Sequence, residues 1–203
     1  MIKILIASLN ENKIEEIKAT FKNTKIEFLS LRDLKDGEDL QETGSSFQEN
    51  AYLKAKHFGD KHHLITLADD SGLMVKALNN RPGINSKRYA GDDTLNNRKL
   101  LKELAGKSRK AVMQTVIALY DPNTKKASYF VGKLKVVISE KPKGEYGFGY
   151  DPLLYLKKYQ KTLAELEPSL KRKLSHRGKA LKKLARKLNK KRGKNGKKDY
   201  FSG

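Results

Sequence analysis

Short apolar runs and amphipathic stretches alternate along the beginning of the chain. Residues 2–8 are almost continuously apolar, which predicts a buried strand. Asn10 and Asn12, in the polar segment that follows, are good helix caps, and residues 25–31 alternate like a second strand. Between them, apolar residues recur at helical spacing, at Ile14, Ile17 and Phe21. This order of strand, loop, helix and strand is the start of an α/β unit.

The rest of the chain continues this mixture of helices and strands. Ser46 and Glu49 have the spacing of a capping box, which predicts the start of a second helix. Further helices are expected at residues 92–104, ended by Gly106, and at about residues 174–188. Strands are expected at residues 64–67, 73–78, 111–120 and 128–139, the last two as an antiparallel pair joined by a turn at 121–123. Residues 144–152 are expected to form a loop.

Composition narrows the class of protein. The 203 residues fit one domain with an appendage, and the basic run at the end predicts a domain over residues 1–188 and a disordered basic tail over 189–203. The lack of cysteine excludes disulfides, thiolate zinc sites and a cysteine nucleophile. Because no apolar run approaches the roughly 20 residues of a membrane span, a cytoplasmic protein without a membrane partner is expected. The net charge of +21 predicts attraction to polyanions: nucleotides, nucleic acid or acidic membrane surfaces.

Two polar clusters follow apolar strands in the N-terminal half, the position where α/β sheets bind ligands. Ser8, Asn10 and Lys13 lie where a helix N-terminus can bind phosphate, and Lys13 adds a charge for a triphosphate. An ordinary capped helix explains the same residues, since no Gly-rich P-loop is present. Asp69 and Asp70 end an apolar strand, where carboxylates need a compensating cation such as Mg²⁺. A capping Asp at a turn is the alternative.

The loop at residues 147–152 supplies a third cluster. Phe148 and Tyr150 are flanked by glycines, which suits a slot where a flat base stacks and the backbone approaches closely. Asp151 is placed to accept a hydrogen bond from a purine N–H. A turn that packs its aromatic residues on the core is the alternative. Glu42, ahead of the second predicted helix, adds a carboxylate that by itself would count as surface charge.

The fourth cluster is Ser175-His176-Arg177-Gly178, preceded by Lys171. The guanidinium of Arg177 suits carbonyl or phosphate oxygens, and His176 can hydrogen-bond a base. A solvated face of a basic helix is the alternative explanation of these residues. Together the four clusters supply phosphate binding, metal binding, base stacking and base-edge donors, which are the parts of a nucleotide site.

In chain order, these segments resemble the inosine/xanthosine triphosphate pyrophosphatase family, which clears non-canonical purines from the nucleotide pool. The resemblance spans about residues 2–188. Its motifs are Ser8-x-Asn10-x-x-Lys13, Glu42-Thr43-Gly44, Phe47-x-Glu49-Asn50-Ala51-x-x-Lys54-Ala55, Ala68-Asp69-Asp70-Ser71-Gly72-Leu73, Pro82-Gly83-x-x-Ser86-x-Arg88-Tyr89-Ala90-Gly91, Phe148-Gly149-Tyr150-Asp151-Pro152 and Ser175-His176-Arg177-Gly178-x-Ala180-Leu181. Ser8 stands where the family frequently has Thr, and the tail extends beyond the family's last helix.

The resemblance implies an elongated α/β fold, in which helices flank a central mixed sheet and two lobes surround an active-site cleft. It also implies a homodimer. The implied activity is metal-dependent hydrolysis of ITP, dITP and XTP to the monophosphate and pyrophosphate. Mg²⁺ is the expected cofactor, and Mn²⁺ would satisfy the same oxygen ligands.

The resemblance also implies roles for individual residues. Asp70 matches the catalytic carboxylate and a metal ligand, and Glu42 matches a second metal ligand. The positions that match substrate contacts are Ser8, Asn10, Lys13, Ser71, Phe148, Gly149, Tyr150, Asp151, Lys171, His176 and Arg177. Arg177 would satisfy the 6-keto oxygen of hypoxanthine or xanthine, whereas adenine presents an amino group there. Because an unsatisfied buried donor costs about 1–3 kcal/mol, ATP should be rejected.

Two rival hypotheses stand beside this one. A basic nucleic-acid-binding module without catalysis would explain the charge. It would not explain the carboxylates, which repel phosphates unless a metal intervenes. A pyrophosphatase of the same fold for modified pyrimidine nucleotides is the nearer rival, although the residues of the base slot favour purines. For the tail, a flexible extension is expected, with weak non-specific nucleic-acid contact as the alternative.

Overall fold

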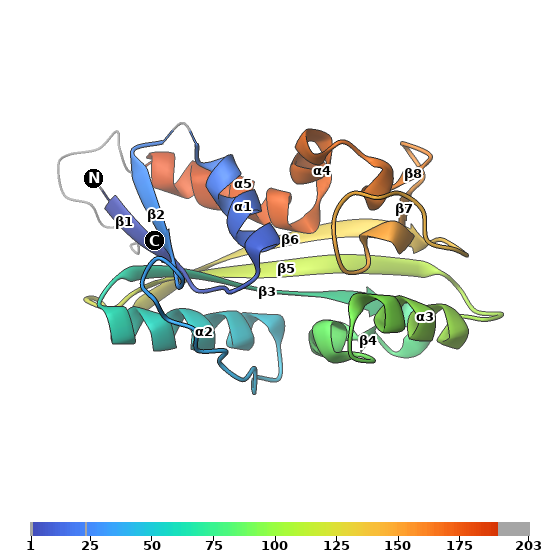
Figure 1. The fold of residues 1–203 in the computed structure, drawn as a ribbon, viewed down its shortest axis with the longest axis horizontal. Helices are drawn as coiled ribbons and strands as arrows, with labels where there is room; N and C mark the ends of the chain where they lie inside the picture. The colour runs from blue at the N-terminus through green and yellow to red at the C-terminus, as the bar shows by residue number, and fades with distance from the viewer. Residues whose placement is uncertain (1, 23, 191–203) are drawn as a thin grey trace. The chain divides into compact units, whose positions relative to one another are not determined.

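The computed structural model describes residues 2–22 and 24–190, so most of the predicted basic tail lies outside the described residues. Figure 1 shows the helices and strands of the described chain. In order they are β1 (Ile2–Ile6), α1 (Glu11–Thr20), β2 (Ile26–Ser30), α2 (Phe47–His62), β3 (Ile65–Val75), β4 (Arg81–Pro82), α3 (Asp93–Glu103), β5 (Lys110–Asp121), β6 (Lys126–Ile138), β7 (Leu154–Leu156), β8 (Lys161–Thr162), α4 (Pro168–Leu174) and α5 (His176–Lys190).

The eight strands form one mixed sheet in the order β2-β1-β3-β5-β6-β7-β8, with β4 paired to β3. β1 runs parallel to both of its neighbours, so Ile4 lies opposite Phe28 of β2 and Ile65 of β3. The pairs β3–β4, β6–β7 and β7–β8 are antiparallel. The predicted α/β fold with a mixed sheet flanked by helices is therefore confirmed, and the expected cleft stays a prediction.

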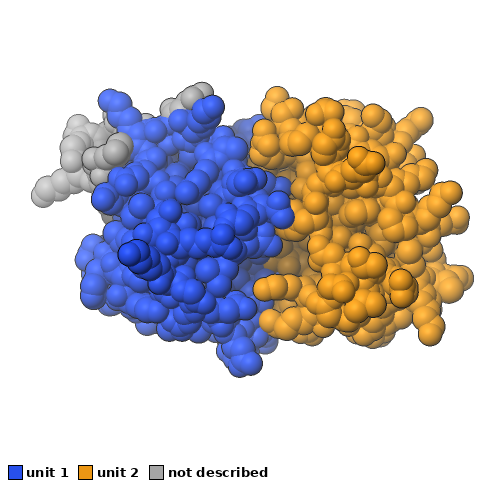
Figure 2. Space-filling model, viewed as in Figure 1, with its two compact units in different colours: residues 1–70, 116–131, 180–203 blue, residues 71–115, 132–179 orange. Residues whose placement is uncertain are grey.

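The chain divides into two compact units, coloured separately in Figure 2. Unit 1 comprises residues 1–70, 116–131 and 180–203, and unit 2 comprises residues 71–115 and 132–179. Strands β3, β5 and β6 each contribute residues to both units. Of the helices in the described part of the chain, none combines the length and apolar character that crossing a bilayer requires.

Unit 1 has a buried apolar layer on each face of its sheet because β1 and β5 carry apolar side chains on both faces. Ile4 and Ile6 belong to the layer packed against α1 and α5. Leu5 and Ala7 belong to the layer packed against α2, as do Ala118 and Tyr120 of β5. Successive side chains of a strand point to opposite faces, so a continuously apolar strand is covered on both sides. Figure 1 shows α1 and α5 on one side of these strands and α2 on the other.

Unit 2 is built around a separate core. Leu73 and Val75 from β3 pack with residues from α3, β6 and the segments that follow β6. The members of this core include Leu100, Leu104, Leu134, Val136, Ile138, Leu153 and Leu163. The loop at residues 147–152 contributes Tyr150 to the same core, which anchors the loop to the unit.

The capping signals at Asn10 and Ser46 fixed two helix starts correctly, whereas Asn12, the other candidate cap, lies inside α1. Asn10, Ser46 and Asp92 are the N-caps of α1, α2 and α3, and each side-chain oxygen accepts from the third residue after it. The capping box of α2 differs from the prediction in one respect. Glu49 accepts from the backbone N–H of Ser45 at 2.8 Å, one residue before the cap.

The sequence prediction was wrong at three places. The strand expected at 64–67 continues as β3 to Val75, because the period-two alternation resumes with the buried Leu73 and Val75. Residues 76–78 form a short 3₁₀ helix instead of strand. The helix expected at about 174–188 is α5, but α4, which precedes it and is separated from it by the extended backbone of Ser175, was not expected. The short strands β4, β7 and β8 were not expected, because two or three residues carry too little periodicity.

Candidate active site

The paired carboxylates lie inside β3 rather than at its end, which corrects the sequence prediction. The parallel pairing of β1 with β3 covers only Ile65 to Leu67, so β1 stops before the carboxylates begin. Asp69 and Asp70 are 2% and 4% exposed. Because they are successive residues of a strand, their side chains leave opposite faces, and each needs its own compensation.

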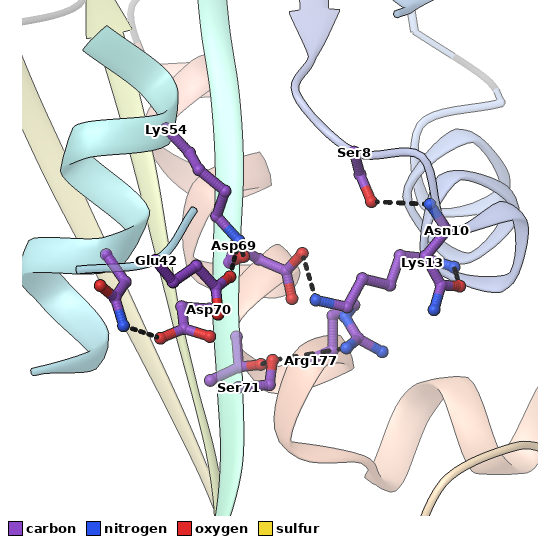
Figure 3. A network of polar contacts seen from close by, with 11 residues as sticks. Ser8, Asn10, Lys13, Glu42, Lys54, Asp69, Asp70, Ser71 and Arg177 are labelled. Atoms are coloured by element: carbon purple, nitrogen blue, oxygen red, sulfur yellow. Dashed lines mark hydrogen bonds and ion pairs between the residues drawn. The ribbon is translucent and has the colours of Figure 1, made fainter. Parts of the chain in front are cut away.

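Lys13 compensates Asp69 from the first turn of α1. Its Nζ lies 3.2 Å from Asp69 Oδ1, and Figure 3 shows the two side chains pointing at one another. The preceding loop is ordered by local bonds, since Ser8 Oγ accepts from the Asn10 N–H at 3.2 Å. Asn10 Oδ1 in turn accepts from the Lys13 N–H at 3.2 Å. Asn10 therefore caps helix α1 through its side-chain oxygen. The phosphate contact predicted for this side chain would have to be made by its amide nitrogen.

Lys54 links the Glu42 carboxylate to the backbone of β3 at Asp69. It lies on α2, and its Nζ contacts Glu42 Oε1 at 2.5 Å and the backbone oxygen of Asp69 at 2.9 Å. Burial opposes the ammonium charge, but the carboxylates of Glu42, Asp69 and Asp70 outweigh burial and raise the pKa of Lys54. Glu42 is therefore part of a partly buried ion pair with Lys54. The interpretation of Glu42 as an isolated surface charge does not apply.

This environment strongly alters the pKa of Asp70. Burial, and then repulsion from the Glu42 carboxylate, raise the pKa of Asp70 to about 6. The charge of Lys54, a hydrogen bond from Asn50 and the charge of Lys13 act in the opposite direction. Asn50 Nδ2 donates to Asp70 Oδ2 at 3.0 Å. Such a carboxylate is mostly ionised at neutral pH but takes up a proton or a cation more readily than an exposed carboxylate, which suits a metal ligand and a general base.

Unit 2 begins at Ser71, the residue after Asp70, and gathers a second polar group. The Ser71 and Thr115 hydroxyls are hydrogen-bonded, and Arg177 donates through Nη2 to Ser71 Oγ at 3.4 Å. Arg177 and His176 open α5, where Ser175 Oγ accepts from the Gly178 N–H. Both side chains are buried, at 3% and 4% exposure, so a solvated helix face is the wrong explanation of these two residues.

The loop at residues 147–151 is held by Lys171 and by α3. Lys171 Nζ lies 2.7 Å from Asp151 Oδ2 and 4.8 Å from the centre of the Phe148 ring. Asp151 Oδ2 also accepts from the Phe148 N–H at 3.1 Å. A side chain at Gly147 would lie 2.3 Å from Asp151 Oδ2, so the close approach requires glycine. Asp151 therefore orders the loop and orients Lys171, in addition to any contact with a base.

Two positions of this loop have different environments. Gly149 is fixed from α3, because its N–H donates to Asp93 Oδ2 at 2.7 Å and its oxygen accepts from Asn97. Tyr150 is buried in the core of unit 2 and donates to the Ser86 carbonyl at 2.9 Å. For Tyr150 the structure favours the packing interpretation. Phe148 is half-buried, and the cationic groups of Lys171 and Arg177 lie over its ring. Since Tyr150 packs in the core, Phe148 is the aromatic residue of this loop that remains suited to stacking on a base.

Three residues near these groups were given no role in the sequence analysis. Asn50 and Lys54 are four residues apart on α2, a spacing that places both on one helix face, so the pattern could have revealed them. Thr115 lies inside β5, where a single hydroxyl gave no signal. The other predicted residues of unit 1 form one network of ion pairs and hydrogen bonds around Asp69 and Asp70.

The fold and these polar groups define an α/β protein with buried carboxylates on a central strand and lysines that reach them from flanking helices. A family model for the Ham1 family matches residues 4–187. The dITP/XTP pyrophosphatase of Thermoanaerobacter pseudethanolicus is 45% identical over 189 residues, covering 90% of this chain and 94% of that protein. The dITP/XTP pyrophosphatase of Oceanobacillus iheyensis is 41% identical over 191 residues, covering 91% and 96%.

A solved structure agrees with these sequence relatives. A HAM1 protein from Coxiella burnetii superposes with a TM-score of 0.87 at 38% identity, covering 94% of this chain and all of that one. The chain belongs to the Ham1 family. The family resemblance expected from the sequence motifs is thereby confirmed.

Proposed function

We propose that this chain hydrolyses non-canonical purine nucleoside triphosphates, such as dITP, XTP and ITP, to the monophosphate and pyrophosphate. Membership of the Ham1 family and the names of its dITP/XTP pyrophosphatase relatives support the substrate class. The observation that carries the proposal is Asp70, a buried carboxylate whose pKa is raised to about 6 beside Glu42 and Lys54. Such a group is suited to remove a proton at neutral pH.

The donor set of unit 1 fits a hard divalent cation. Glu42 and Asp70 offer carboxylate oxygens, which Mg²⁺ and Mn²⁺ both accept. Within residues 2–22 and 24–190, no three His, Cys, Asp or Glu side chains come together as a ready metal-binding group. A site of two carboxylates completed by water and substrate phosphate is the usual arrangement for Mg²⁺. When bound, the ion supplies neutralisation of phosphate charge.

The residues of the chain supply the remaining chemistry. Asp70 accepts a proton from water as the water oxygen bonds to the α-phosphorus. The bond from that phosphorus to the oxygen that bridges to the β-phosphorus breaks, and pyrophosphate leaves with that oxygen. Lys13, held at 3.2 Å from Asp69, and the backbone and side chains of Ser8 and Asn10 bind phosphate oxygens. The Ser71 hydroxyl adds a further donor.

Recognition of the base belongs to the residues of unit 2. Phe148 provides the stacking surface, and Gly149 lets the backbone approach. Arg177 donates to the 6-keto oxygen of hypoxanthine or xanthine, with His176, Lys171 and the loop residues Tyr150 and Asp151 forming its surroundings. Because adenine presents a donor at this position, each donor left unsatisfied costs about 1–3 kcal/mol. ATP is therefore rejected. GTP carries the same keto group, so its exclusion depends on the 2-amino position.

Product analysis with purified protein, Mg²⁺ and ITP or ATP tests the proposal. IMP and pyrophosphate from ITP, little product from ATP and none in EDTA are expected. IDP and phosphate would place the cut at the wrong bond and refute the assignment. Turnover of modified pyrimidine triphosphates alone would favour the pyrimidine rival, and no turnover of either class would favour the nucleic-acid-binding module.

We also propose a cytoplasmic homodimer, as the family resemblance implies. Sedimentation of the purified chain at twice the monomer mass would support it, and a monomer at all concentrations would contradict it. The predicted nucleic-acid contact of residues 189–203 stays a prediction. It would be weak and non-specific, and RNA binding at low salt that survives deletion of those residues would contradict it.

A further inference from the structure

Asn50 has a buried carboxamide with both ends in use. It lies in the first turn of α2 and is 1% exposed. Its Oδ1 accepts from the Gly44 N–H at 2.7 Å, and its Nδ2 donates to Asp70 Oδ2 at 3.0 Å. A backbone N–H can only donate, so the amide oxygen must face Gly44 and the NH₂ must face Asp70. The orientation of the carboxamide is therefore fixed by its partners.

The partner on the loop side is equally constrained. Gly44 comes two residues after Glu42, so its position sets where that carboxylate leaves the loop. A side chain at Gly44 would lie 2.6 Å from Asn50 Oδ1 and 2.9 Å from Glu49 Cγ. Only glycine permits the loop to come this close to α2. One turn further along α2, Lys54 holds Glu42 itself at 2.5 Å.

Helix α2 thus holds the Glu42 loop at two points, and at one of them Asn50 also donates a hydrogen bond to the Asp70 side chain. We propose that Asn50 is a positioning residue for the pyrophosphatase reaction, an inference that rests on the proposed function. Its carboxamide orients the Asp70 carboxylate through Nδ2. Through Oδ1 the same carboxamide binds Gly44, at the end of the loop that carries Glu42. Partners that orient metal-binding side chains typically change metal affinity or activity about 10–100-fold when removed.

Asn50→Ala tests the proposal, with Asn96→Ala as a matched control. Asn96 is also buried, at 2% exposure, and its carboxamide bonds the backbone of Ala90, Ser86 and Lys87 in unit 2. Mg²⁺ binding is measured by calorimetry without nucleotide and with IMP, beside kcat, KM and urea unfolding. For Asn50→Ala, kcat and Mg²⁺ affinity should each fall about 10–100-fold while KM for ITP stays near the wild-type value.

Asn96→Ala should lose stability and keep both kcat and Mg²⁺ affinity. Asn50→Ala with wild-type kcat and Mg²⁺ affinity would overturn the proposal. Equal losses in the two variants would overturn it too, because they would show a general effect of a missing buried amide. Wild-type protein that releases no pyrophosphate from ITP would refute the proposed function itself, which keeps the two failures apart.

A second pair of variants acts from the loop side and leaves Asn50 in place. Gly44→Ala puts a methyl group against Asn50 Oδ1, whereas Gly37→Ala, in the same loop, meets no atom within 4 Å. We expect Gly44→Ala to lower kcat and Mg²⁺ affinity in the same direction as Asn50→Ala, and Gly37→Ala to match the wild type. Indistinguishable kcat and Mg²⁺ affinity in the two glycine variants would overturn the link between the loop and Asp70.

Discussion

Asp70→Asn is expected to stabilise the metal-free protein at neutral pH while abolishing its proposed turnover. The carboxylate is 4% exposed, and burial and Glu42 raise its pKa from 3.8 to about 6. A raised pKa means that the ionised form is disfavoured in the folded state. The stabilising contribution of the protonated group is fully present below the unfolded pKa and is lost as pH rises through 6. Asn has the same shape, carries no charge and can still accept from Asn50 Nδ2.

The magnitude follows from the shift in the pKa of Asp70. A rise from 3.8 to about 6 lowers the unfolding free energy of the wild type by roughly 3 kcal/mol at pH 8. At a pH below both pKa values the rise has no effect on stability. Asp70→Asn should therefore exceed the wild type by up to about 3 kcal/mol at pH 8, and the gap should close as pH falls from 6 towards 4. Mg²⁺ should reverse the order, because an ion that binds only the folded wild type stabilises it.

Urea unfolding in EDTA at a series of pH values, repeated with Mg²⁺, measures these differences. Asp39→Asn is the control, since Asp39 is an exposed carboxylate near Glu42, and its replacement should change stability little at any pH. A gap between Asp70→Asn and wild type that is the same at pH 8 and pH 5 would refute the electrostatic reasoning. Wild-type turnover in Asp70→Asn would refute the role of Asp70 in the reaction.

Lys171→Met removes the ammonium that lies 2.7 Å from the buried Asp151 carboxylate. Urea unfolding should show a loss of about 3–5 kcal/mol, partly restored by adding Asp151→Asn; no restoration would contradict the ion-pair explanation. Arg177→Ala should narrow the preference for ITP over ATP in kcat/KM by about 10–100-fold, and an unchanged ratio would remove Arg177 from base recognition. Phe148→Leu should raise KM for ITP about 10-fold through lost stacking, whereas an unaltered KM would argue against the platform. Lys13→Met should lower kcat/KM about 100-fold in steady-state assays, and a loss below threefold would exclude a role in phosphate stabilisation.

The parts of the fold that the sequence predicted are those governed by local rules. Asn10, Ser46 and Asp92 cap their helices because the hydrogen bond spans only three residues. The continuous apolar run of β1 and the alternation of residues 25–31 likewise appear within a short window. Element types were therefore predicted correctly where the periodic segments were long.

The errors arose where distant residues decide the outcome. β3 continues through Asp69 and Asp70 because Lys13 compensates one carboxylate and Asn50 bonds the other, and these partners come from α1 and α2. The close approach of α4 to the start of α5 depends on Gly178, where a side chain would lie 1.6 Å from the Arg172 oxygen. No local pattern in the sequence contains these distances.

The network of unit 1 was predicted as separate clusters, and its connections and the roles of Asn50 and Lys54 were missing. Ser8, Asn10 and Lys13 were found from their place at a helix start. Glu42 was assigned through the family resemblance, and the structure gives its physical reason in the ion pair with Lys54. For Tyr150, aromatic character alone could not separate stacking on a base from packing in the core of unit 2.

The core of unit 1 joins the two ends of the described chain. Ile4 and Ile6 of β1 share one buried layer with Leu184 and Leu188 of α5. During synthesis from the N-terminus, β1 and α1 therefore leave the ribosome long before the residues that cover them exist. Their apolar faces stay exposed in the nascent chain, and unit 1 is completed only after α5 has been synthesised. A premature stop codon ahead of α5 would thus yield a product that lacks one wall of this core, whatever part of the polar network it retained.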